Sequence, residues 1–348
     1  MADGGRRQQR AYIGSFTAAG GLGVLTAAVD PDDGALTVLS AVDAVPDPSY
    51  LAVSPTGDFL YAVSETAEGA VAAFRVHADK PEPAGPPTRV GGSGPTHLSL
   101  LDGHVLTANY NSGSVSAVPL RPDGALAEAA SGVLQHTGSG PYTPRQQGPH
   151  AHQVQPDPTG RWAVSVDLGT DSVRVCALDG GTLTVHREIA LRPGSGPRHL
   201  AFHPDGEHAY VLNELAPTVT VCRWDSAEGV LRPLGETPVL PDVPDGDAFP
   251  SGIAVSPDGR FVWTATRGQD VVSVLAPDAA GEGLRLVATV PCGGVWPRDL
   301  SLDPSGRFLY AANERSGDVT WFVVDPDTGV PRRGGSVEAP AASCVVFG

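Results

Sequence analysis

The 348-residue sequence has no apolar run of about 18 residues, so nothing in it predicts a helix that crosses a membrane. Its first residues, MADGGRRQQR, also lack the apolar stretch of a secretory signal peptide. Positive charge is scarce, because 23 Lys and Arg stand against 39 Asp and Glu, for a formal net charge of −16. This balance disfavours binding to nucleic acid or to an anionic membrane. We therefore expect a soluble, cytoplasmic protein that binds neither.

Lysine and cysteine, which carry several covalent and metal-dependent chemistries, are rare. The only lysine, Lys80, lies in the Pro-rich stretch ADKPEPAGPP, which argues against Schiff-base chemistry. The four cysteines form no CxxC pair, and no His stands at zinc-finger spacing from them. Cys176 and Cys222 hold matching places in DSVRVCALD and PTVTVCRWD, which predicts buried strand positions. We expect neither a cofactor nor a bound metal.

Glycine (43 residues) and proline (33 residues) are abundant, and they mark an internal repeat. In each unit an alternating run meets a turn such as SPDGR, and a second alternating run follows. Pro presets φ and Gly accepts a positive φ, so the pattern predicts a hairpin, which a further pair of strands follows. The leading prolines recur roughly every 50 residues, the length of a four-stranded propeller blade. The six units span residues 48–65, 94–110, 148–168, 196–214, 249–267 and 296–314.

The two ends of the chain complete the pattern. Residues 340–348, PAASCVVFG, resemble a lone first strand, and residues 11–16, AYIGSF, resemble a second strand. Joined, they make a seventh blade and remove the open sheet edges of an unclosed array. We predict an all-β fold, a seven-bladed β-propeller with four antiparallel strands per blade, closed by the N- and C-terminal strands in one blade. It spans residues 11–348 as one domain, after a disordered tail at residues 1–10.

Functional residues are expected at one mouth of the central channel, where the start of each first strand lies beside the end of the second. Structural turn positions usually repeat one small residue, whereas this rim carries Arg, His, Glu, Asn and Tyr at equivalent places. The variety predicts an asymmetric polar pocket. Its candidate members are Glu65, His97, Asn109, Tyr110, His150, His152, Asp167, Arg198, His199, Asn213, Glu214, Arg267, Arg298 and Glu314.

Three arginines of this rim, Arg198, Arg267 and Arg298, come from consecutive blades and could converge on one anion. A guanidinium suits bidentate recognition of carboxylate or phosphate. The alternative is that each arginine pairs with an acidic neighbour and holds blades together.

The histidines have open alternatives too. His150 and His152 stand two apart, so on a strand they face the same way and could bind metal, transfer a proton or hydrogen-bond at a blade junction. His97 and His199 follow a shared Pro-x-His pattern, which favours a common structural role. Glu214 could orient a histidine, act as a base or bridge to an arginine.

Longer stretches of the sequence resemble the cytosolic lactonase family of seven-bladed propellers, which includes a propeller-type 6-phosphogluconolactonase and the fungal 3-carboxy-cis,cis-muconate lactonizing enzyme. The resemblance covers nearly the whole chain, and its most specific stretches are TANYNSGSVSAVPL, GSGPYTPRQQGPHAHQVQPDPTGRWAVSVDLGTD and GSGPRHLAFHPDGEHAYVLNEL. It implies active-site roles for His152 or His150 of PHAH, Arg198 of GPRH, Glu214 of the NE pair and Arg267. Arg267 stands in TRG where the family has NRG, so that Thr266 replaces an Asn.

We therefore expect a metal-independent enzyme that hydrolyses, or reversibly forms, a small anionic lactone such as 6-phosphogluconolactone or a carboxymuconolactone. Arg198 and Arg267 hold the acidic group, and His152, tuned by Glu214, moves a proton. No GxSxG nucleophile elbow is present, which disfavours an acyl-enzyme. A closed ring needs no partner, so a monomer is compatible with the sequence.

Two alternatives remain. One is a metal-dependent propeller lactonase, in which the oxygen ligands preferred by Ca²⁺ come from the rim. Its candidate ligands are Glu65, Asn109, Asp167, Asn213 and Glu314. The other is a non-catalytic binding propeller, because units such as PRDLSLDPSGRFLYAANERSGDVTWFVVD resemble YVTN-type repeats and the fold hosts many functions.

Overall fold

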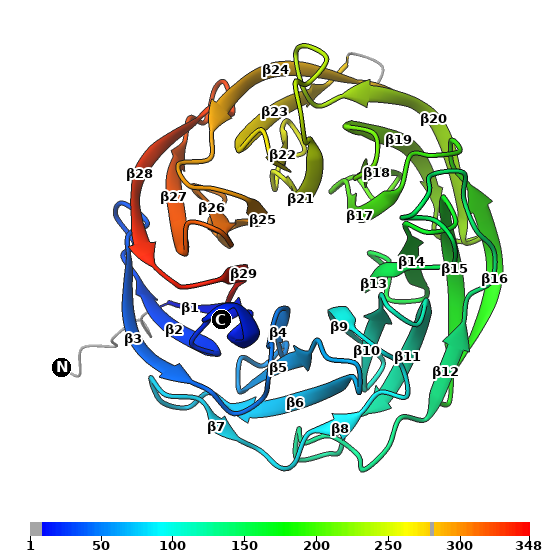
Figure 1. The fold of residues 1–348 in the computed structure, drawn as a ribbon, viewed down its shortest axis with the longest axis vertical. Helices are drawn as coiled ribbons and strands as arrows, with labels where there is room; N and C mark the ends of the chain where they lie inside the picture. Colours follow the sequence, from blue (N-terminus) through cyan, green and yellow to red (C-terminus); the bar gives the residue numbers. More distant parts are fainter. Residues whose placement is uncertain (1–8, 279–281) are drawn as a thin grey trace.

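The structure, a computed structural model, describes residues 9–278 and 282–348, which form seven antiparallel sheets arranged in a ring (Figure 1). The predicted all-β, seven-bladed propeller is confirmed. We number the sheets as blades 1 to 7 from the N-terminus. In each blade, the strand that is named first below lies nearest the centre. Residues 1–8, most of the predicted tail, lie outside the described part. Arg10, also assigned to the tail, is the first residue of β1.

Blade 1 is the closing blade, and blades 2 to 4 follow it along the chain. Its strands are β29 (Ala342–Phe347), β1 (Arg10–Ser15), β2 (Val24–Val29) and β3 (Leu36–Val42). Blade 2 comprises β4 (Leu51–Val53), β5 (Phe59–Ser64), β6 (Ala70–Arg75), β7 (Glu82–Pro83) and β8 (Thr88–Arg89). Blade 3 comprises β9 (Pro95–Leu101), β10 (His104–Asn109), β11 (Ser114–Pro119) and β12 (Gly132–Gln135). Blade 4 comprises β13 (Ala151–Pro156), β14 (Ala163–Asp167), β15 (Ser172–Asp179) and β16 (Thr182–Ala190).

The remaining three blades have the same order of strands. Blade 5 comprises β17 (Pro197–Phe202), β18 (His208–Asn213), β19 (Thr218–Asp225) and β20 (Val230–Pro238). Blade 6 comprises β21 (Phe249–Val255), β22 (Val262–Arg267), β23 (Val271–Pro277) and β24 (Leu284–Pro291). Blade 7 comprises β25 (Pro297–Leu302), β26 (Phe308–Asn313), β27 (Asp318–Val324) and β28 (Pro331–Glu338).

The outer edge of blade 2 departs from the regular pattern. Its fourth strand is split into two short pieces, β7 and β8, and both pair with β6. The chain between them is rich in proline, which has no N–H to donate to a ladder. The proline content therefore accounts for the interruption.

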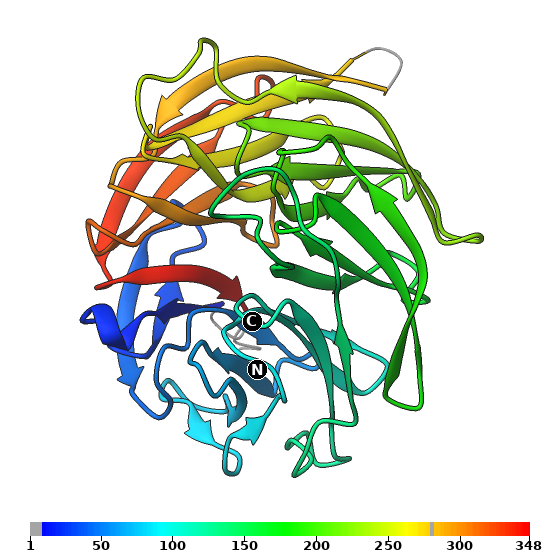
Figure 2. The same ribbon diagram turned by 45° about the vertical axis from the view of Figure 1, so that its right-hand side comes forward.

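The ring closes by pairing of the two chain ends, as predicted. β29 lies antiparallel to β1, with Tyr12 opposite Val346 and Gly14 opposite Cys344. Figure 2 shows β29 beside β1, near the centre of the molecule. Ile13 and Val345 are buried in one core cluster that also contains Tyr310 of blade 7, so closure joins the last blade to the first.

The cores lie between neighbouring blades, where the apolar faces of two sheets meet. Tyr210 and Leu212 of blade 5, for example, share a cluster with Val262 and Leu275 of blade 6. The four cysteines are free and buried, as expected for Cys176 and Cys222. Burial raises the pKa of the Cys222 thiol to about 12, so this thiol stays protonated.

The hairpin that joins the two inner strands of a blade is held by its first residue. In blade 4, Asp157 Oδ1 accepts from the backbone N–H of Arg161 and of Trp162, both at 2.9 Å. Asp303 makes the same contacts in blade 7, at 3.0 and 2.8 Å. These turns lie at the opposite end of the channel from the predicted rim.

Helix is almost absent from the described residues. The described residues contain one helical segment, the 3₁₀ turn η1 (Thr17–Ala19). Within that part of the chain, no helix is long and apolar enough to cross a membrane.

Candidate active site

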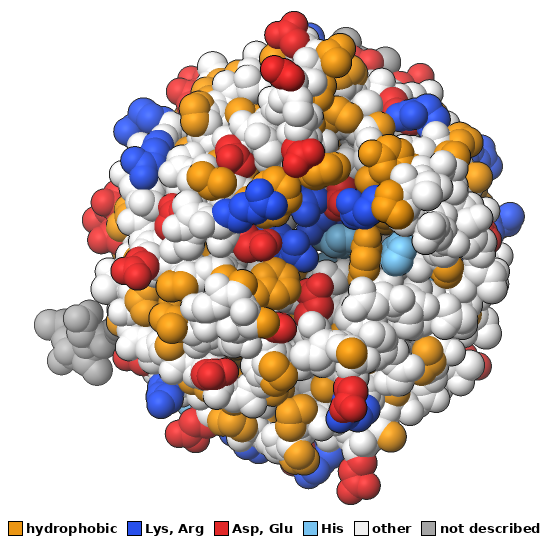
Figure 3. All heavy atoms as spheres, in the orientation of Figure 1, with side chains coloured by type: hydrophobic (Ala, Val, Ile, Leu, Met, Phe, Trp, Pro, Cys, Tyr) orange, Lys and Arg blue, Asp and Glu red, His pale blue; other side chains and the backbone are white. Residues whose placement is uncertain are grey.

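Positive side chains gather at one mouth of the channel. Figure 3 shows Lys and Arg side chains around the central depression, with His and acidic side chains beside them. The site faces the reader in Figure 1, where β4, β9, β13, β17, β21, β25 and β29 surround the centre. In a chain of net charge −16, this concentration of positive charge is local.

Three arginines share a single carboxylate, that of Glu214, which directly follows β18. Glu214 Oε2 lies 3.2 Å from Arg198 Nε and 2.7 Å from Arg267 Nη2. Its other oxygen, Oε1, accepts from Arg145 Nη2 at 2.5 Å. Because three positive charges meet one negative charge, the cluster keeps an excess of positive charge at the rim. We call these four residues the arginine cluster.

The charges of the arginine cluster are fixed at neutral pH. Burial acts to raise the pKa of Glu214, but the positive charges of Arg267, Arg198 and Arg145 outweigh it and hold the pKa at about 2. Burial lowers the pKa of Arg198 to about 9 and shifts that of Arg267 in the same direction. Both guanidiniums stay protonated at pH 7. A carboxylate with so low a pKa is a poor proton acceptor.

Two donors of the arginine cluster are close to Glu214 but poorly aligned with it. Arg198 Nε and Arg267 Nη2 are buried, and neither has a hydrogen bond of good geometry within the described residues. Arg198 is oriented by its other end, where Nη1 donates to the backbone oxygen of Ser251. A buried N–H group without an aligned acceptor is costly, so an incoming anion would find donors already positioned.

His150 lies at the rim in a fixed tautomer. Its Nδ1 is 2.9 Å from the backbone oxygen of Tyr110, and a carbonyl oxygen only accepts, so Nδ1 carries the proton. The lone pair is therefore on Nε2. The ring stacks on that of Tyr110, with 4.4 Å between centroids, and the residue is half-buried.

His152 lies deeper in the channel than His150 and is 5% exposed. Its ring meets those of Tyr110 and His199 edge-on, at 5.4 and 5.2 Å between centroids. Burial, and next the charge of Arg198, hold the pKa of His152 well below its usual range, so the ring is neutral. Nδ1 has no hydrogen-bond partner among the described residues.

His97 and His199 continue this row of rings into the channel. The His97 ring lies 5.7 Å from that of His199 and 4.2 Å from that of Tyr50. Burial, and next Arg198, lower the pKa of His97 to about 3. Both histidines line a cavity of about 740 Å³ whose wall includes Pro158 and Pro304. These prolines belong to hairpin turns, so the cavity opens at the mouth opposite the arginines, and both histidines lie between the two mouths.

Arg298 belongs to a second charged group on the rim. It lies 3.4 Å from Glu314 and 3.9 Å from Glu65, and its guanidinium carbon is 4.7 Å from the ring centre of Phe16. Burial raises the pKa of Glu65, although the charge of Arg298 opposes the shift. Two glutamates thus surround this arginine, whereas three arginines surround Glu214.

Three predicted rim residues turn into the blades instead of the channel. Asn109 donates to the hydroxyls of Ser114 and Ser116 on the next strand, at 3.1 and 2.8 Å. Asn213 makes the equivalent bonds to Thr218 and Thr220, both at 2.9 Å. A substrate-binding role for either side chain is therefore not supported. Each amide group makes its hydrogen bonds within its own blade.

Asp167 is the third of these. Its Oδ2 lies 2.7 Å from His136 Nδ1, and its Oδ1 accepts from the backbone N–H of His150 at 2.9 Å. Burial acts to raise the pKa of Asp167, but the hydrogen bond from His136 and further contacts lower it. Asp167 thus positions the backbone of His150 and has no exposed surface for a ligand.

These orientations also bear on the predicted Ca²⁺ ligands. Of the five residues, Asn109, Asp167 and Asn213 are committed to contacts inside their blades. Glu65 and Glu314 face Arg298. The five oxygen donors do not assemble around one point.

Arg145 is a functional candidate that the repeat pattern of the sequence does not predict. It lies between β12 and β13, in the longest connection between successive blades of the described chain, so the repeat alignment passes over it. Its Nη2 contacts both Glu214 and, at 3.2 Å, the hydroxyl of Tyr110. The sequence feature that could have indicated Arg145 is the stretch GPYTPRQQGPHAH, which contains this arginine and is part of the specific resemblance to the lactonase family.

Comparisons with known proteins agree with this architecture. The family model described as "Lactonase, 7-bladed beta-propeller" matches residues 10–347. A 6-phosphogluconolactonase of Bacillus subtilis is 34% identical over 341 residues, which cover 97% of each chain. A putative 6-phosphogluconolactonase from Bacteroides fragilis superposes with a TM-score of 0.92 at 28% identity, over 100% of both chains. A periplasmic gluconolactonase of Pseudomonas aeruginosa gives 0.91 at 29% identity, over 98% of this chain and 99% of that one.

Proposed function

The chain belongs to the seven-bladed β-propeller lactonase family, and we propose that it hydrolyses a small anionic lactone, with 6-phosphogluconolactone as the leading candidate. One observation carries the proposal: Arg145, Arg198 and Arg267 meet around Glu214 at the channel mouth. The resulting excess of positive charge suits a ligand with a phosphate or carboxylate group. The name of the Bacillus subtilis relative points to the phosphorylated lactone.

In this proposal the arginine cluster binds the substrate and stabilises the charge that develops during reaction. Arg267 and Arg145 hold the acidic group of the lactone, in competition with Glu214. Arg198, which is buried and oriented by Ser251, faces the lactone carbonyl. Preorganised donors of this kind stabilise a developing oxyanion by several kcal/mol in a site that excludes water.

His150 supplies the proton transfer. The bond from Nδ1 to the Tyr110 carbonyl leaves Nε2 as acceptor. Nε2 takes a proton from water, and the water oxygen forms a bond to the lactone carbonyl carbon. When the tetrahedral intermediate collapses, the ring C–O bond breaks and the imidazolium returns the proton to the ring oxygen. The products are a hydroxyl and a carboxylic acid, which ionises. Such positioned transfer contributes roughly 10²–10⁴-fold in rate.

The choice of His150 over His152 rests on exposure and tautomer. The sequence favours His152, but that ring is almost fully buried, and within the described residues its Nδ1 has no partner to fix a tautomer. The contacts of Glu214 run to arginines, so we assign Glu214 to holding the cluster together and not to tuning a histidine.

The test is hydrolysis of 6-phosphogluconolactone by the purified protein and by matched variants. We expect His150→Gln to lower kcat by roughly 10²–10⁴-fold, since it keeps polarity but cannot shuttle a proton. His152→Gln should retain more activity than His150→Gln, and Arg198→Ala should raise KM as well as lower kcat. Arg121→Ala, which removes an exposed arginine paired with Asp123, is the control. Full activity in both His150→Gln and Arg198→Ala would contradict the mechanism.

A parallel assay with carboxymuconolactone distinguishes hydrolysis from reversible ring closure, because only closure interconverts the lactone and its open unsaturated isomer without adding water. Cytoplasmic location stays a prediction, since one similar structure is that of a periplasmic protein. Cell fractionation with an antibody to the chain checks it.

A further inference from the structure

The hairpin turn of blade 5 differs in composition from the corresponding turns of its neighbours. Five blades carry the same six-residue turn between their two inner strands. In four of them the first residue is Ser or Asp and the last is Phe or Trp, whereas blade 5 has histidine at both places. The five turns are residues 54–59 (SPTGDF), 157–162 (DPTGRW), 203–208 (HPDGEH), 256–261 (SPDGRF) and 303–308 (DPSGRF).

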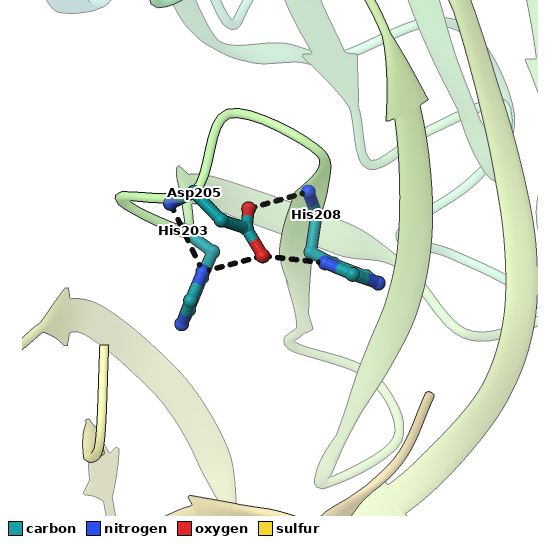
Figure 4. A group of neighbouring side chains, drawn as sticks. All are labelled: His203, Asp205 and His208. Atoms are coloured by element: carbon teal, nitrogen blue, oxygen red, sulfur yellow. Dashed lines mark hydrogen bonds and ion pairs between the residues drawn. The ribbon is translucent and has the colours of Figure 1, made fainter. Parts of the chain in front are cut away.

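In blade 5 the two imidazoles converge on one carboxylate oxygen. Asp205 Oδ2 lies 2.9 Å from His203 Nδ1 and 2.8 Å from His208 Nδ1 (Figure 4). The three atoms all lie within 4.8 Å of one another. The other oxygen of Asp205 is held in place by the backbone N–H groups of Glu207 and His208, at 2.7 and 3.1 Å.

The hydrogen bonds of His203 place the lone pair of its Nδ1 next to the negatively charged carboxylate of Asp205. Its Nε2 is 3.1 Å from the backbone oxygen of Gly259, an acceptor, so Nε2 carries the proton of the neutral ring. Nδ1 then has the lone pair and accepts from the backbone N–H of Asp205 at 3.2 Å. The same lone pair faces Asp205 Oδ2 at 2.9 Å. Two acceptors at this distance repel unless a positive charge lies between them.

Asp205 is available as an anionic ligand. The side chains are partly open to solvent, with 17% of His203, 13% of His208 and 36% of Asp205 exposed. An ion can therefore reach the three ligand atoms directly from solution.

We propose that His203, Asp205 and His208 form a binding site for a divalent transition-metal ion of the zinc type, with His203 Nδ1, His208 Nδ1 and Asp205 Oδ2 as ligands. Two imidazoles and a carboxylate are a ligand set that Zn²⁺ accepts, whereas Mg²⁺ and Ca²⁺ prefer oxygen alone. Zinc at about 2.0–2.2 Å from each ligand separates neighbouring ligand atoms by about 3.3 Å. The carboxylate oxygen therefore moves away from both nitrogens by a few tenths of an ångström, and the two nitrogens, now at most 4.8 Å apart, adjust to the same separation. Water completes the coordination.

The site is structural in character and distinct from the arginine cluster. It lies at the hairpin turn between β17 and β18, whereas Arg198 and Glu214 lie at the other end of the same two strands. Through the bond from His203 to Gly259, it also connects the turns of blades 5 and 6. Metal binding should therefore stabilise the fold and leave lactone hydrolysis unchanged.

The neighbouring blade supplies a matched variant. The double change His203→Ser and His208→Phe gives the turn of blade 5 the Ser, Asp and Phe of 256–261, a combination that this fold already accommodates. Tag-free protein is stripped with chelator and titrated with Zn²⁺ by calorimetry, and thermal unfolding is followed with and without the ion. We expect one zinc ion per chain and a rise in Tm for the wild type, both lost in the double variant.

Two further variants test whether zinc binds at these residues and not elsewhere on the chain. Asp205→Asn keeps the shape of the turn and removes one anionic ligand, so it should weaken zinc binding at least about tenfold. His77→Ser removes an exposed histidine near Asp58 and should bind zinc as the wild type does. Absence of zinc binding by the wild type, or the same isotherm and Tm rise in the double variant, would overturn the proposal.

Discussion

Glu214 is the residue on which the electrostatics of the rim depends. It is 2% exposed and shared by three guanidiniums, so its charge is stabilised far more in the folded chain than in the unfolded one. The negative charge of this carboxylate also reduces the repulsion among the three guanidiniums. It thereby holds the site together before any substrate is bound.

The depressed pKa of Glu214 predicts a pH-dependent contribution to stability. The folded pKa is about 2 against an ordinary value of 4.5, so the contribution is present above pH 4.5 and is lost as the pH falls toward 2. At about 1.4 kcal/mol per pH unit, it amounts to roughly 3 kcal/mol at pH 7. Urea unfolding of wild type and Glu214→Gln checks this: the difference in unfolding free energy should shrink between pH 5 and pH 3. A difference that does not change with pH contradicts it.

Replacement of Arg145 should affect substrate binding much more than the stability of the fold. It lies in a connecting segment with 35% of its side chain exposed, and it contacts Glu214 and the Tyr110 hydroxyl. We expect Arg145→Ala to raise KM for an anionic lactone by roughly tenfold, since charged hydrogen bonds contribute about 1.5–3 kcal/mol. The unfolding free energy should change by no more than about 1 kcal/mol, because Arg198 and Arg267 still pair with Glu214 and the Arg145 side chain is partly exposed. Steady-state kinetics and urea unfolding measure the two quantities, and an unchanged KM would exclude Arg145 from the site.

At the scale of the element, an asparagine ends the second strand in three blades and binds the third strand. Asn109, Asn213 and Asn313 each donate from Nδ2 to a hydroxyl seven residues further along the chain. The distances to these hydroxyls are 2.8 to 3.1 Å. The repetition identifies a structural device of the blade, placed next to residues that face the channel.

Removing one of these amides should destabilise the blade. We expect Asn109→Ala to lower the unfolding free energy by about 1–3 kcal/mol, because it leaves the buried hydroxyl of Ser116 without a donor and removes one of the two partners of Ser114. Asn111→Ala, two residues further on and exposed, is the control and should be nearly neutral. Chemical denaturation of both variants gives the comparison. Equal effects would contradict the conclusion that the Asn109 amide stabilises its blade.

The blades were predictable from the sequence because each hairpin repeats the same local chemistry. The PDG-type turns, the strand alternation and the split closing blade all follow from patterns of a few residues, and the resemblance to the lactonase family is confirmed. The direction of a side chain at a strand end does not follow from such patterns. Asn213 and Glu214 are adjacent, yet one bonds within its blade and the other binds arginines. Arg145 lies outside the repeat, so no alignment of blades indicated it.

At the scale of the whole molecule, the ring depends on how closely β1 and β29 approach. Gly14 lies opposite Cys344, and a Cβ at Gly14 would come within 2.5 Å of the Pro48 oxygen and 2.8 Å of the Cys344 sulfur. No such contact is tolerated without movement of the neighbouring backbone. The closing blade therefore requires glycine at this position.

A pair of glycine substitutions tests this requirement. We expect Gly14→Ala to lower the unfolding free energy by about 1–3 kcal/mol through overpacking. Gly235→Ala, on the outer strand β20, meets no atom within 4 Å and should have little effect. Thermal unfolding of the two variants compares them directly. Equal values of Tm would show that closure tolerates a side chain here.

Pairing of β1 with β29 also sets an order in time. The ribosome produces β1 before β29, and synthesis of the chain between them at 5–20 residues per second leaves β1 without this neighbour for roughly 15 to 70 s. During that interval the inner edge of β1 exposes unpaired backbone groups, a template for non-native association. Nascent chains of this protein should consequently engage chaperones until β29 emerges, even though the finished ring presents no such edge there.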